Sequence, residues 1–284
     1  MRFAKGHGTG NDFVLLPDLD DRLALDAPTV RALCDRHAGL GADGILRIVR
    51  SGDGSAPWFM DYRNADGSLA EMCGNGIRVF ARYLLDHGLA DGPELRIETR
   101  GGVRAVRAEP DGTLTVDMGP AVPGPAGQVV AGGRTFTGLA VSVGNPHLAC
   151  LTAGPLEEID LSVPPQVDLA AFPDGVNVEF VAPAGQHAIA MRVHERGSGE
   201  TMSCGTGAVA AAVAAAVASG EWDSGRDGGA SAARRWTVEL AGGRLAVTPS
   251  ATASLLTGPA VIVAEGEVAA SWLDDHRTRA SAVS

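Results

Sequence analysis

The feature that most constrains this chain is an internal repeat, because motifs of the first half recur in the same order in the second half. The matched segments are residues 10–13 (GNDF) with 144–147 (GNPH), 72–76 (MCGNG) with 203–207 (SCGTG), 98–102 (ETRGG) with 239–243 (ELAGG), and 118–121 (MGPA) with 257–260 (TGPA). Four ordered matches at a nearly constant separation are hard to produce by chance. They predict a duplicated α/β unit, with two lobes facing each other about a pseudo-twofold axis.

The repeat predicts an N-terminal lobe over residues 1–120 and a C-terminal lobe over 121–263, with a strand and tail at 264–284 returning to the first lobe. The Pro/Gly-rich stretch 121–133 indicates a connection, because such a run does not continue a helix or a central strand. Polar stretches at 223–235 and after Trp272 indicate a surface loop and a frayed end. Helices are expected at 28–37, 76–87 and 206–219, and short strands at 95–100, 114–118, 176–182, 189–194 and 236–240.

Charge and hydropathy exclude several kinds of partner. The formal net charge is −11 and the pI is near 5.0, which gives no electrostatic reason to bind nucleic acid or an anionic membrane. The N-terminus lacks the apolar run of a signal sequence. The alanine-rich run 208–218 is too short to span a bilayer. We therefore expect a soluble, cytoplasmic protein with no nucleic-acid or membrane partner.

Cysteine and lysine usage narrows the chemistry further. The four cysteines are widely spaced, and none forms a CxxC or Cys/His pair at metal-ligand spacing, so we expect reduced thiols and no metal. Lys5 is the only lysine, and an enzyme that uses pyridoxal phosphate needs a Schiff-base lysine. The sequence therefore predicts chemistry without a cofactor.

Each half of the repeat places a cysteine, Cys73 or Cys204, directly before Gly-x-Gly and the start of a helix. Such a helix start presents backbone N–H groups and partial positive charge, which bind an anion and lower the pKa of a nearby thiol. One such cysteine could simply cap a buried helix, but two at equivalent positions favour a pair of reactive thiols. Cys34 and Cys150 lack this setting and are expected to be ordinary buried residues.

Two acid/base groups related by a twofold axis would lie on opposite sides of whatever binds between the lobes. Inversion at a carbon that carries hydrogen needs this arrangement, because one group removes a proton from one face and the other returns a proton to the opposite face. The two helix starts would stabilise the charge that develops on the adjacent carboxylate. These features predict a cofactor-independent amino-acid racemase or epimerase.

The motifs resemble the diaminopimelate epimerase family over nearly the whole chain. They are residues 5–13 (KGHGTGNDF), 63–68 (RNADGS), 71–76 (EMCGNG), 144–147 (GNPH), 175–180 (GVNVEF), 195–201 (ERGSGET) and 204–207 (CGTG). The resemblance implies an isomerase that interconverts LL- and meso-2,6-diaminopimelate, for lysine and peptidoglycan precursors. It also implies an α+β fold of two lobes, each a curled, mostly antiparallel sheet around a central helix. The family often forms dimers, so a homodimer is an expectation of the resemblance alone.

The resemblance assigns roles position by position. Cys73 and Cys204 match the acid/base pair, with His147 and Glu195 near the reacting centre. The positions that match substrate contacts are Gly74, Asn75, Gly205 and Thr206 at the reacting carboxylate, Asn11, Asn64, Asn145, Asn177 and Arg196 at the remote end of the substrate, and Glu195 beside the reacting centre. An arginine fork suits a carboxylate, and asparagines serve ammonium and carboxylate alike. One departure is Gly44, where some members carry a glutamine that touches substrate.

Three alternatives stay open at this point. A proline or hydroxyproline racemase or epimerase uses two cysteines but has no remote carboxylate to hold, which Asn64, Asn177 and Arg196 argue against. A phenazine-pathway isomerase lacks the cysteine pair. A non-catalytic binder of dicarboxylic amino acids would need the anion sites but neither thiol.

Overall fold

The computed structural model describes residues 1–52, 54–222 and 234–273, and the chain divides into two compact units. The first unit combines Met1–Val116 with Pro259–Ser284, and the second is Asp117–Gly258. The sequence predicted boundaries after residues 120 and 263, a few residues later than the observed boundaries after Val116 and Gly258. Because the second observed boundary precedes residue 261, the strand Val261–Glu267 belongs wholly to the first unit.

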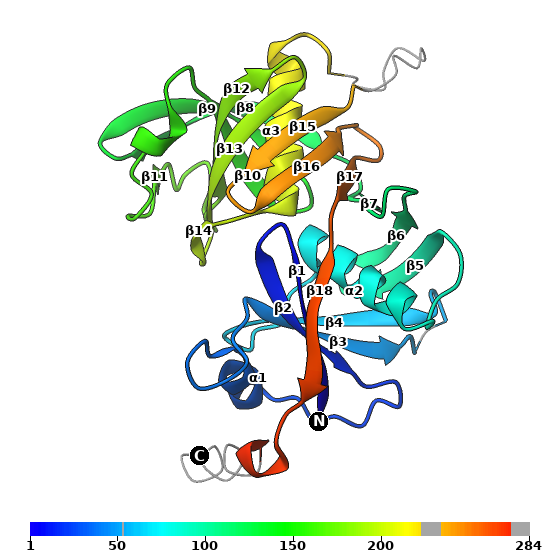
Figure 1. The fold of residues 1–284 in the computed structure, drawn as a ribbon. Coiled ribbons are helices and arrows are strands. Elements are labelled where there is room, and N and C mark those ends of the chain that lie inside the picture. The colour runs from blue at the N-terminus through cyan, green and yellow to red at the C-terminus, as the bar shows by residue number, and fades with distance from the viewer. Residues whose placement is uncertain (53, 223–233, 274–284) are drawn as a thin grey trace. The chain divides into compact units, whose positions relative to one another are not determined.

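The first unit is a sheet whose neighbouring strands follow the order β18-β1-β2-β3-β4-β5-β6-β7 (Figure 1). Its strands are β1 (Arg2–Gly8), β2 (Asn11–Pro17), β3 (Gly44–Arg50), β4 (Trp58–Asn64), β5 (Glu94–Thr99), β6 (Gly102–Ala108), β7 (Leu114–Asp117) and β18 (Val261–Glu267). The pairs β2–β3 and β4–β5 are parallel, and the other neighbours in this order are antiparallel. Helix α1 (Ala27–Cys34) lies between β2 and β3 in sequence, and α2 (Gly74–Asp86) lies between β4 and β5.

The second unit repeats this topology in the order β8-β9-β10-β12-β13-β15-β16-β17. Its strands are β8 (Val122–Ala131), β9 (Arg134–Ser142), β10 (Pro146–Leu151), β12 (Asn177–Gly185), β13 (Ala188–Glu195), β15 (Trp236–Leu240), β16 (Gly243–Thr248) and β17 (Leu255–Gly258). Here β10–β12 and β13–β15 are the parallel pairs, and α3 (Gly205–Ala218) precedes β15. Short pieces complete the unit: the 3₁₀ turn Leu156–Glu158, β11 (Gln166–Val167) and β14 (Gly199–Thr201). The matching order and strand directions confirm the duplication.

The two central helices suit their places in different ways. Helix α3 is alanine-rich and buried from Gly207 to Ala216, because small side chains allow strands of its own unit to approach it closely. Helix α2 is amphipathic, with Ile77 and Phe80 in the core while Asp86 reaches solvent. The expected helices 76–87 and 206–219 therefore begin one or two residues earlier than the sequence indicates, at the glycine after each cysteine.

The expected connection over residues 121–133 is wrong, because β8 occupies Val122–Ala131. Its prolines are tolerated because the pairing with β9 is irregular between Pro123 and Ala126. The expected loop 223–235 lies largely outside the described residues, and so does the tail from residue 274. Among the described helices, none is both long and apolar enough to cross a membrane.

Candidate active site

The first half-site is built around Cys73, the N-cap residue of α2. Its backbone is extended (φ −140°, ψ 122°), and its sulfur accepts a hydrogen bond from the Gly76 N–H at 3.3 Å. The side chain is half-buried, whereas the Gly74–Gly76 backbone that follows is buried. The helix start therefore directs its N–H groups and partial positive charge towards this thiol.

A buried arginine organises the residues around Cys73. The Cys73 thiol donates to Asn11 Oδ1 at 3.7 Å, and Asn75 Nδ2 donates to the same oxygen at 3.4 Å. Arg78 is fully buried and donates through Nη2 to Asn75 Oδ1 at 2.9 Å and through Nη1 to the Gly74 carbonyl at 2.8 Å. Burial lowers the pKa of Arg78 to about 10, which leaves it cationic at neutral pH, while the attraction of Cys73 acts in the opposite direction. Asn11 thus contacts Cys73 and Asn75, although the resemblance assigned it to the remote end of the substrate.

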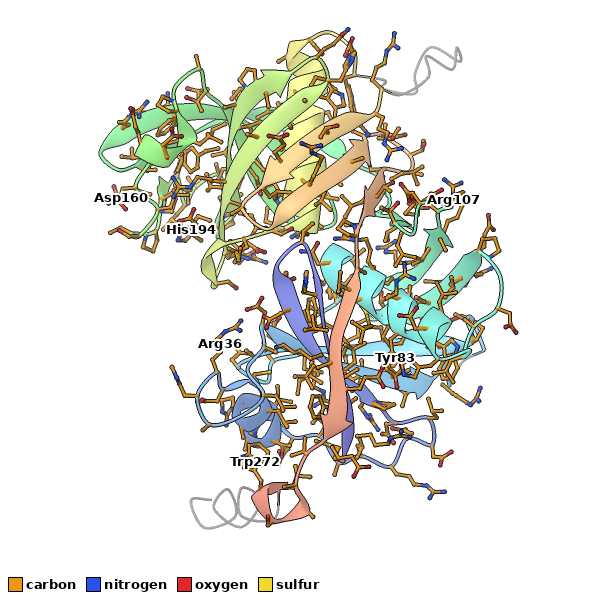
Figure 2. The ribbon with its side chains drawn as sticks, in the orientation of Figure 1. Arg36, Tyr83, Arg107, Asp160, His194 and Trp272 are labelled. Atoms are coloured by element: carbon orange, nitrogen blue, oxygen red, sulfur yellow. The ribbon has the colours of Figure 1, made fainter. Side chains whose placement is uncertain are left out.

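The aspartate of the GNDF motif belongs to a supporting ion network. Asp12 pairs with Lys5 at 2.6 Å and with Arg36 at 2.8 Å, and Arg36 also reaches Asp43 at 2.6 Å (Figure 2 labels Arg36). Burial opposes ionisation of Asp12, but hydrogen bonds from Arg36 and Lys5 outweigh it and hold the pKa well below its usual range. Asp43 accepts from Asn11 Nδ2 at 2.7 Å. The network therefore orients Asn11.

Asn64 and Gly44 face each other at the paired ends of β4 and β3. Asn64 Nδ2 donates to Ser68 Oγ at 3.0 Å. A Cβ on Gly44 would lie 2.6 Å from the Arg63 carbonyl oxygen and 2.9 Å from the Tyr62 ring. A glutamine at this position would therefore need the neighbouring strand to move, which accounts for the glycine.

The second half-site repeats the geometry around Cys204, the N-cap residue of α3. Its backbone is extended (φ −123°, ψ 118°), and its sulfur accepts from the Gly207 N–H at 3.4 Å. The Cys204 sulfur also lies 3.5 Å from Thr206 Oγ1. In contrast to Cys73, Cys204 is buried, with 6% of its surface exposed.

A chain of hydrogen bonds runs from the Cys204 thiol into the core. Asn145 Nδ2 donates to Thr206 Oγ1 at 3.4 Å, and Asn145 Oδ1 lies 3.0 Å from His147 Nε2. The other ring nitrogen of His147, Nδ1, lies 2.7 Å from Glu179 Oε1. The structure thus brings Thr206, Asn145 and His147 together and adds Glu179, although the resemblance assigned Asn145 to the remote end of the substrate.

Asn177, Glu195 and Arg196 lie at neighbouring ends of β12 and β13. Asn177 Oδ1 accepts from the Arg196 N–H at 3.0 Å, and its Nδ2 donates to the Pro146 carbonyl at 3.1 Å. Glu195 follows His194 (labelled in Figure 2) at the end of β13 and accepts from Thr201 Oγ1. Arg196 is exposed and reaches the Asp174 carbonyl at 2.9 Å. Asn177 therefore positions the backbone that carries Glu195 and Arg196.

The expectation of a lowered thiol pKa is wrong for Cys204. Burial raises its pKa well above the ordinary value, and the nearby carboxyl groups of Glu195 and Glu179 add to this. The hydrogen bonds from Thr206 and the helix start oppose the shift without cancelling it. Cys204 is therefore held as a thiol in this structure. Cys34 and Cys150 are buried, which raises the pKa of each to about 12, as expected of ordinary core cysteines.

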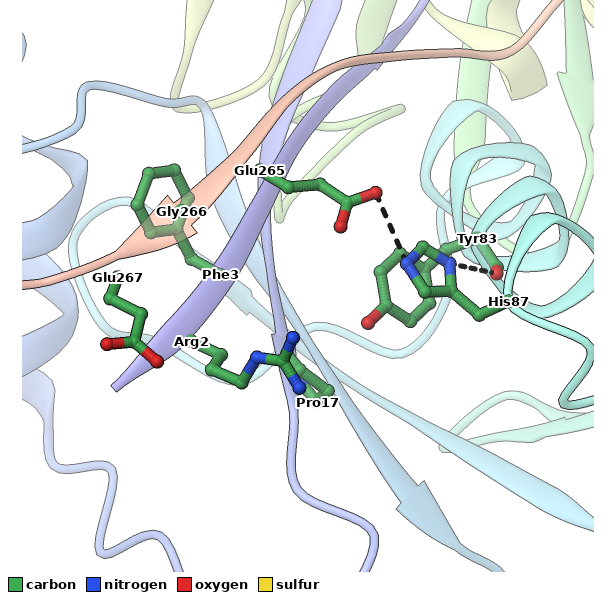
Figure 3. A pocket seen from close by; sticks show the side chains of 8 residues that line it. All are labelled: Arg2, Phe3, Pro17, Tyr83, His87, Glu265, Gly266 and Glu267. Atoms are coloured by element: carbon green, nitrogen blue, oxygen red, sulfur yellow. Dashed lines mark hydrogen bonds and ion pairs between the residues drawn. The ribbon is translucent and has the colours of Figure 1, made fainter.

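Each unit has a cavity among its described residues. One, of about 330 Å³ in the second unit, is lined by Asn145 and His147 together with residues of β8 and β9. The other, of about 340 Å³, is lined by Tyr83, His87 and Glu265 among others, and neither Cys73 nor Cys204 is one of its lining residues (Figure 3). There His87 stacks on Tyr83 with ring centroids 3.8 Å apart and pairs with Glu265 at 3.2 Å. The cavity lined by Asn145 and His147 therefore adjoins the second half-site.

Sequence reasoning missed two buried charged residues, Arg78 and Glu179. Each is a single charge within an otherwise apolar segment, IRVF in α2 and NVEFV in β12. An isolated charge in a buried element is the signal that could have found them, because such a group must be paired or neutralised. Thr9 supports the residues around Cys73, since its hydroxyl donates to Asn75 Oδ1 at 3.3 Å.

Comparisons with known proteins identify the family and the fold. The family model for diaminopimelate epimerase matches residues 3–123 and 139–268. A diaminopimelate epimerase of Thermobifida fusca is 53% identical, over 96% of this chain and all of the relative. A phenazine biosynthesis protein of the PhzF family from Bacillus anthracis (TM-score 0.70) and a hydroxyproline epimerase from Agrobacterium vitis (TM-score 0.68) share the fold. These two solved structures are each 16% identical to the chain; both alignments cover 95% of it, with 99% of the first and 92% of the second. The chain belongs to the diaminopimelate epimerase family.

Proposed function

We propose that this protein interconverts LL- and meso-2,6-diaminopimelate without a cofactor, through a thiolate and a thiol. The observation that carries the mechanism is a cysteine at the N-cap of the central helix in each of two topologically equivalent units. Membership of the family supports the substrate.

In the proposed reaction, Cys73 in its thiolate form removes the α-proton, and the Cys204 thiol delivers its own proton to the opposite face of the same carbon. The two cysteines exchange protonation states, so the reverse reaction uses them in swapped roles. Two features support this assignment. The positive charge of Arg78 attracts a thiolate at Cys73, and burial keeps Cys204 protonated.

The α-proton of an amino acid is far less acidic than a thiol, so the developing charge on the α-carboxylate needs stabilisation. We assign this to the helix starts at Gly74 and Asn75, and at Gly205 and Thr206, whose N–H groups and dipoles favour an anion. The remote end of the substrate is assigned to Asn64, Asn177 and Arg196. The exposed Arg196 guanidinium suits the second carboxylate.

Exchange with solvent tests the proposal directly. Purified protein is incubated with LL-diaminopimelate in D₂O under reducing agent and without pyridoxal phosphate. We expect meso product with one deuterium at the inverted α-carbon. Chiral chromatography detects the meso isomer, and mass spectrometry detects the deuterium. The absence of both product and deuterium would overturn the substrate, and proline and hydroxyproline would then serve as probes.

The setting of the reaction is part of the same proposal. The resemblance supports a cytoplasmic enzyme that supplies lysine and peptidoglycan precursors, and it also supports a homodimer. Light scattering coupled to size-exclusion chromatography measures the oligomeric state, and a mass of 29.0 kDa in solution would contradict the dimer.

A further inference from the structure

His147 and Glu179 form a buried, hydrogen-bonded pair beneath the start of α3. Both side chains are completely buried, and Nδ1 lies 2.7 Å from Oε1. The second carboxyl oxygen, Glu179 Oε2, is also buried and has no hydrogen-bond partner among the described residues. The arrangement therefore raises the question of where the protons of the pair reside.

One proton is located by the hydrogen-bond chain. Asn145 Nδ2 donates to Thr206 Oγ1, which leaves Asn145 Oδ1 facing His147 Nε2 at 3.0 Å. An amide oxygen only accepts hydrogen bonds, so Nε2 carries a hydrogen. A second proton then lies between Nδ1 and Glu179 Oε1, on one of these two atoms.

The surroundings favour the neutral form, in which this second proton is on the carboxyl group. An ionised carboxylate would leave negative charge on a buried oxygen that has no donor among the described residues, whereas an un-ionised acid loses much less on burial. The titratable groups that interact with Glu179 are His147 on β10, Glu195 on β13, Cys204 before α3 and Cys150 on β10. Burial is the largest cause that raises the pKa of Glu179, and Glu195 adds to it, while His147 opposes it.

The first unit shows that the fold does not require this pair. The register of β10 with β12 matches that of β2 with β3, so His147 corresponds to Phe13 and Glu179 to Leu46. Phe13 and Leu46 both lie under the start of α2, within 3.4 Å of a Cβ placed on Gly76. In the second unit, Glu179 Oε1 occupies the corresponding place, 2.7 Å from a Cβ placed on Gly207. A polar pair has thus replaced an apolar one at one of two equivalent sites.

We propose that Glu179 is a positioning residue in its un-ionised form, whose carboxyl O–H donates to His147 Nδ1. This hydrogen bond fixes the neutral His147 tautomer with its hydrogen on Nε2. His147 then orients the amide of Asn145, and Asn145 in turn orients Thr206 beside the Cys204 sulfur. With Glu179 neutral, burial and Glu195 still raise the pKa of Cys204, because burial is the larger cause.

The protonation state is tested by ¹⁵N NMR of the enzyme labelled at histidine, with the His147 signals identified by their absence from a variant that lacks His147. At neutral pH we expect the pattern of a neutral imidazole protonated at Nε2. Signals of an imidazolium would overturn the proposal. This measurement needs no turnover, so it is independent of the proposed function.

The positioning role is tested by two variants. Glu179→Gln keeps a neutral donor for Nδ1, whereas Glu179→Leu removes the donor and introduces the residue found at position 46 of the first unit. We expect Glu179→Leu to lower kcat/KM by about tenfold or more, the effect of one lost buried hydrogen-bond partner. Glu179→Gln should restore kcat/KM to within about threefold of the unmodified enzyme.

The double variant His147→Phe with Glu179→Leu recreates the Phe13/Leu46 pair and serves as the folding control. It should unfold cooperatively on heating while lacking the His147 NMR signals. Equal activity of the leucine and glutamine variants, or equal damage in both while they remain folded, would overturn the positioning role. The activity measurements rest on the proposed function, whereas the NMR measurement does not. The NMR result therefore shows whether the positioning proposal fails separately from the proposed function.

Discussion

The two half-sites have the same backbone plan but different surroundings. In both, a cysteine caps the central helix and accepts a hydrogen bond from the glycine N–H three residues later. Beneath α2 lie Phe13 and Leu46, whereas beneath α3 lie His147 and Glu179. The comparison teaches that both units keep the cysteine-capped helix start while the residues beneath it differ.

The difference extends to charge. Arg78, inside α2, brings a buried cation to Cys73, and the corresponding position of α3 is Val209. Cys204 instead has Glu195 nearby and little solvent. The proposed reaction uses one thiolate and one thiol, and the unequal surroundings favour the thiolate at Cys73 and the thiol at Cys204.

The largest expected effect comes from removing either thiol. Cys73→Ala and Cys204→Ala should each lower the rate of epimerisation by roughly 10²–10⁴-fold or more, because each loses one proton-transfer group. The rates are measured by chiral chromatography. Cys34→Ala, which removes a buried thiol outside both half-sites, is the control and should retain turnover. Near-normal activity in either catalytic variant would remove that cysteine from the mechanism and break the comparison.

An intermediate effect is expected from adding a methyl group beneath each helix start. Gly207→Ala places Cβ 2.7 Å from Glu179 Oε1, so the carboxyl group must shift. We expect a loss of about 1–3 kcal/mol in the free energy of unfolding and about tenfold or more in kcat/KM.

Gly76→Ala is the matched control, because its nearest neighbours are the flexible Leu46 side chain at 3.3 Å and the Cys73 and Phe13 side chains at 3.4 Å. Alanine also gains helix propensity over glycine, so the unfolding free energy should change by less than about 1 kcal/mol. Thermal or urea unfolding measures both variants. A larger loss of unfolding free energy from Gly76→Ala than from Gly207→Ala would contradict the proposed difference between the residues beneath the two helix starts.

An effect of similar size concerns the reactivity of the thiols in the unmodified protein. At neutral pH, iodoacetamide should modify Cys73 at least about tenfold faster than Cys204, because the thiolate is the nucleophile and the pKa of Cys204 is raised. Raising the pH should speed up modification of Cys204, since its thiolate forms only as the pH approaches the raised pKa. Peptide mass spectrometry follows both sites. Faster modification of Cys204 at neutral pH would reverse the assignment.

Local patterns were sufficient for much of the fold. The glycines after each cysteine and the apolar spacing predicted α2 and α3 to within a few residues. The Pro/Gly-rich stretch 121–133 was wrongly predicted to be a connection, because it forms strand β8. The strand accommodates its prolines at an irregularity in the β8–β9 pairing, which composition does not reveal. The resemblance assigned Asn11 and Asn145 to the remote end of the substrate, but the structure places Asn11 against Cys73 and Asn75. It places Asn145 against Thr206 and His147.

The sequence by itself determined the duplication, the two cysteine-capped helix starts and membership of the family, because these depend on residue order and local backbone preference. Tertiary structure alone decided the ionisation of Cys204 and the pairing of His147 with Glu179. The equivalence of Glu179 and Leu46 appears only when β10 is placed beside β12 and β2 beside β3. Burial and strand register join residues far apart in the chain, and these determine the pKa of a thiol and the partner of a buried carboxyl group.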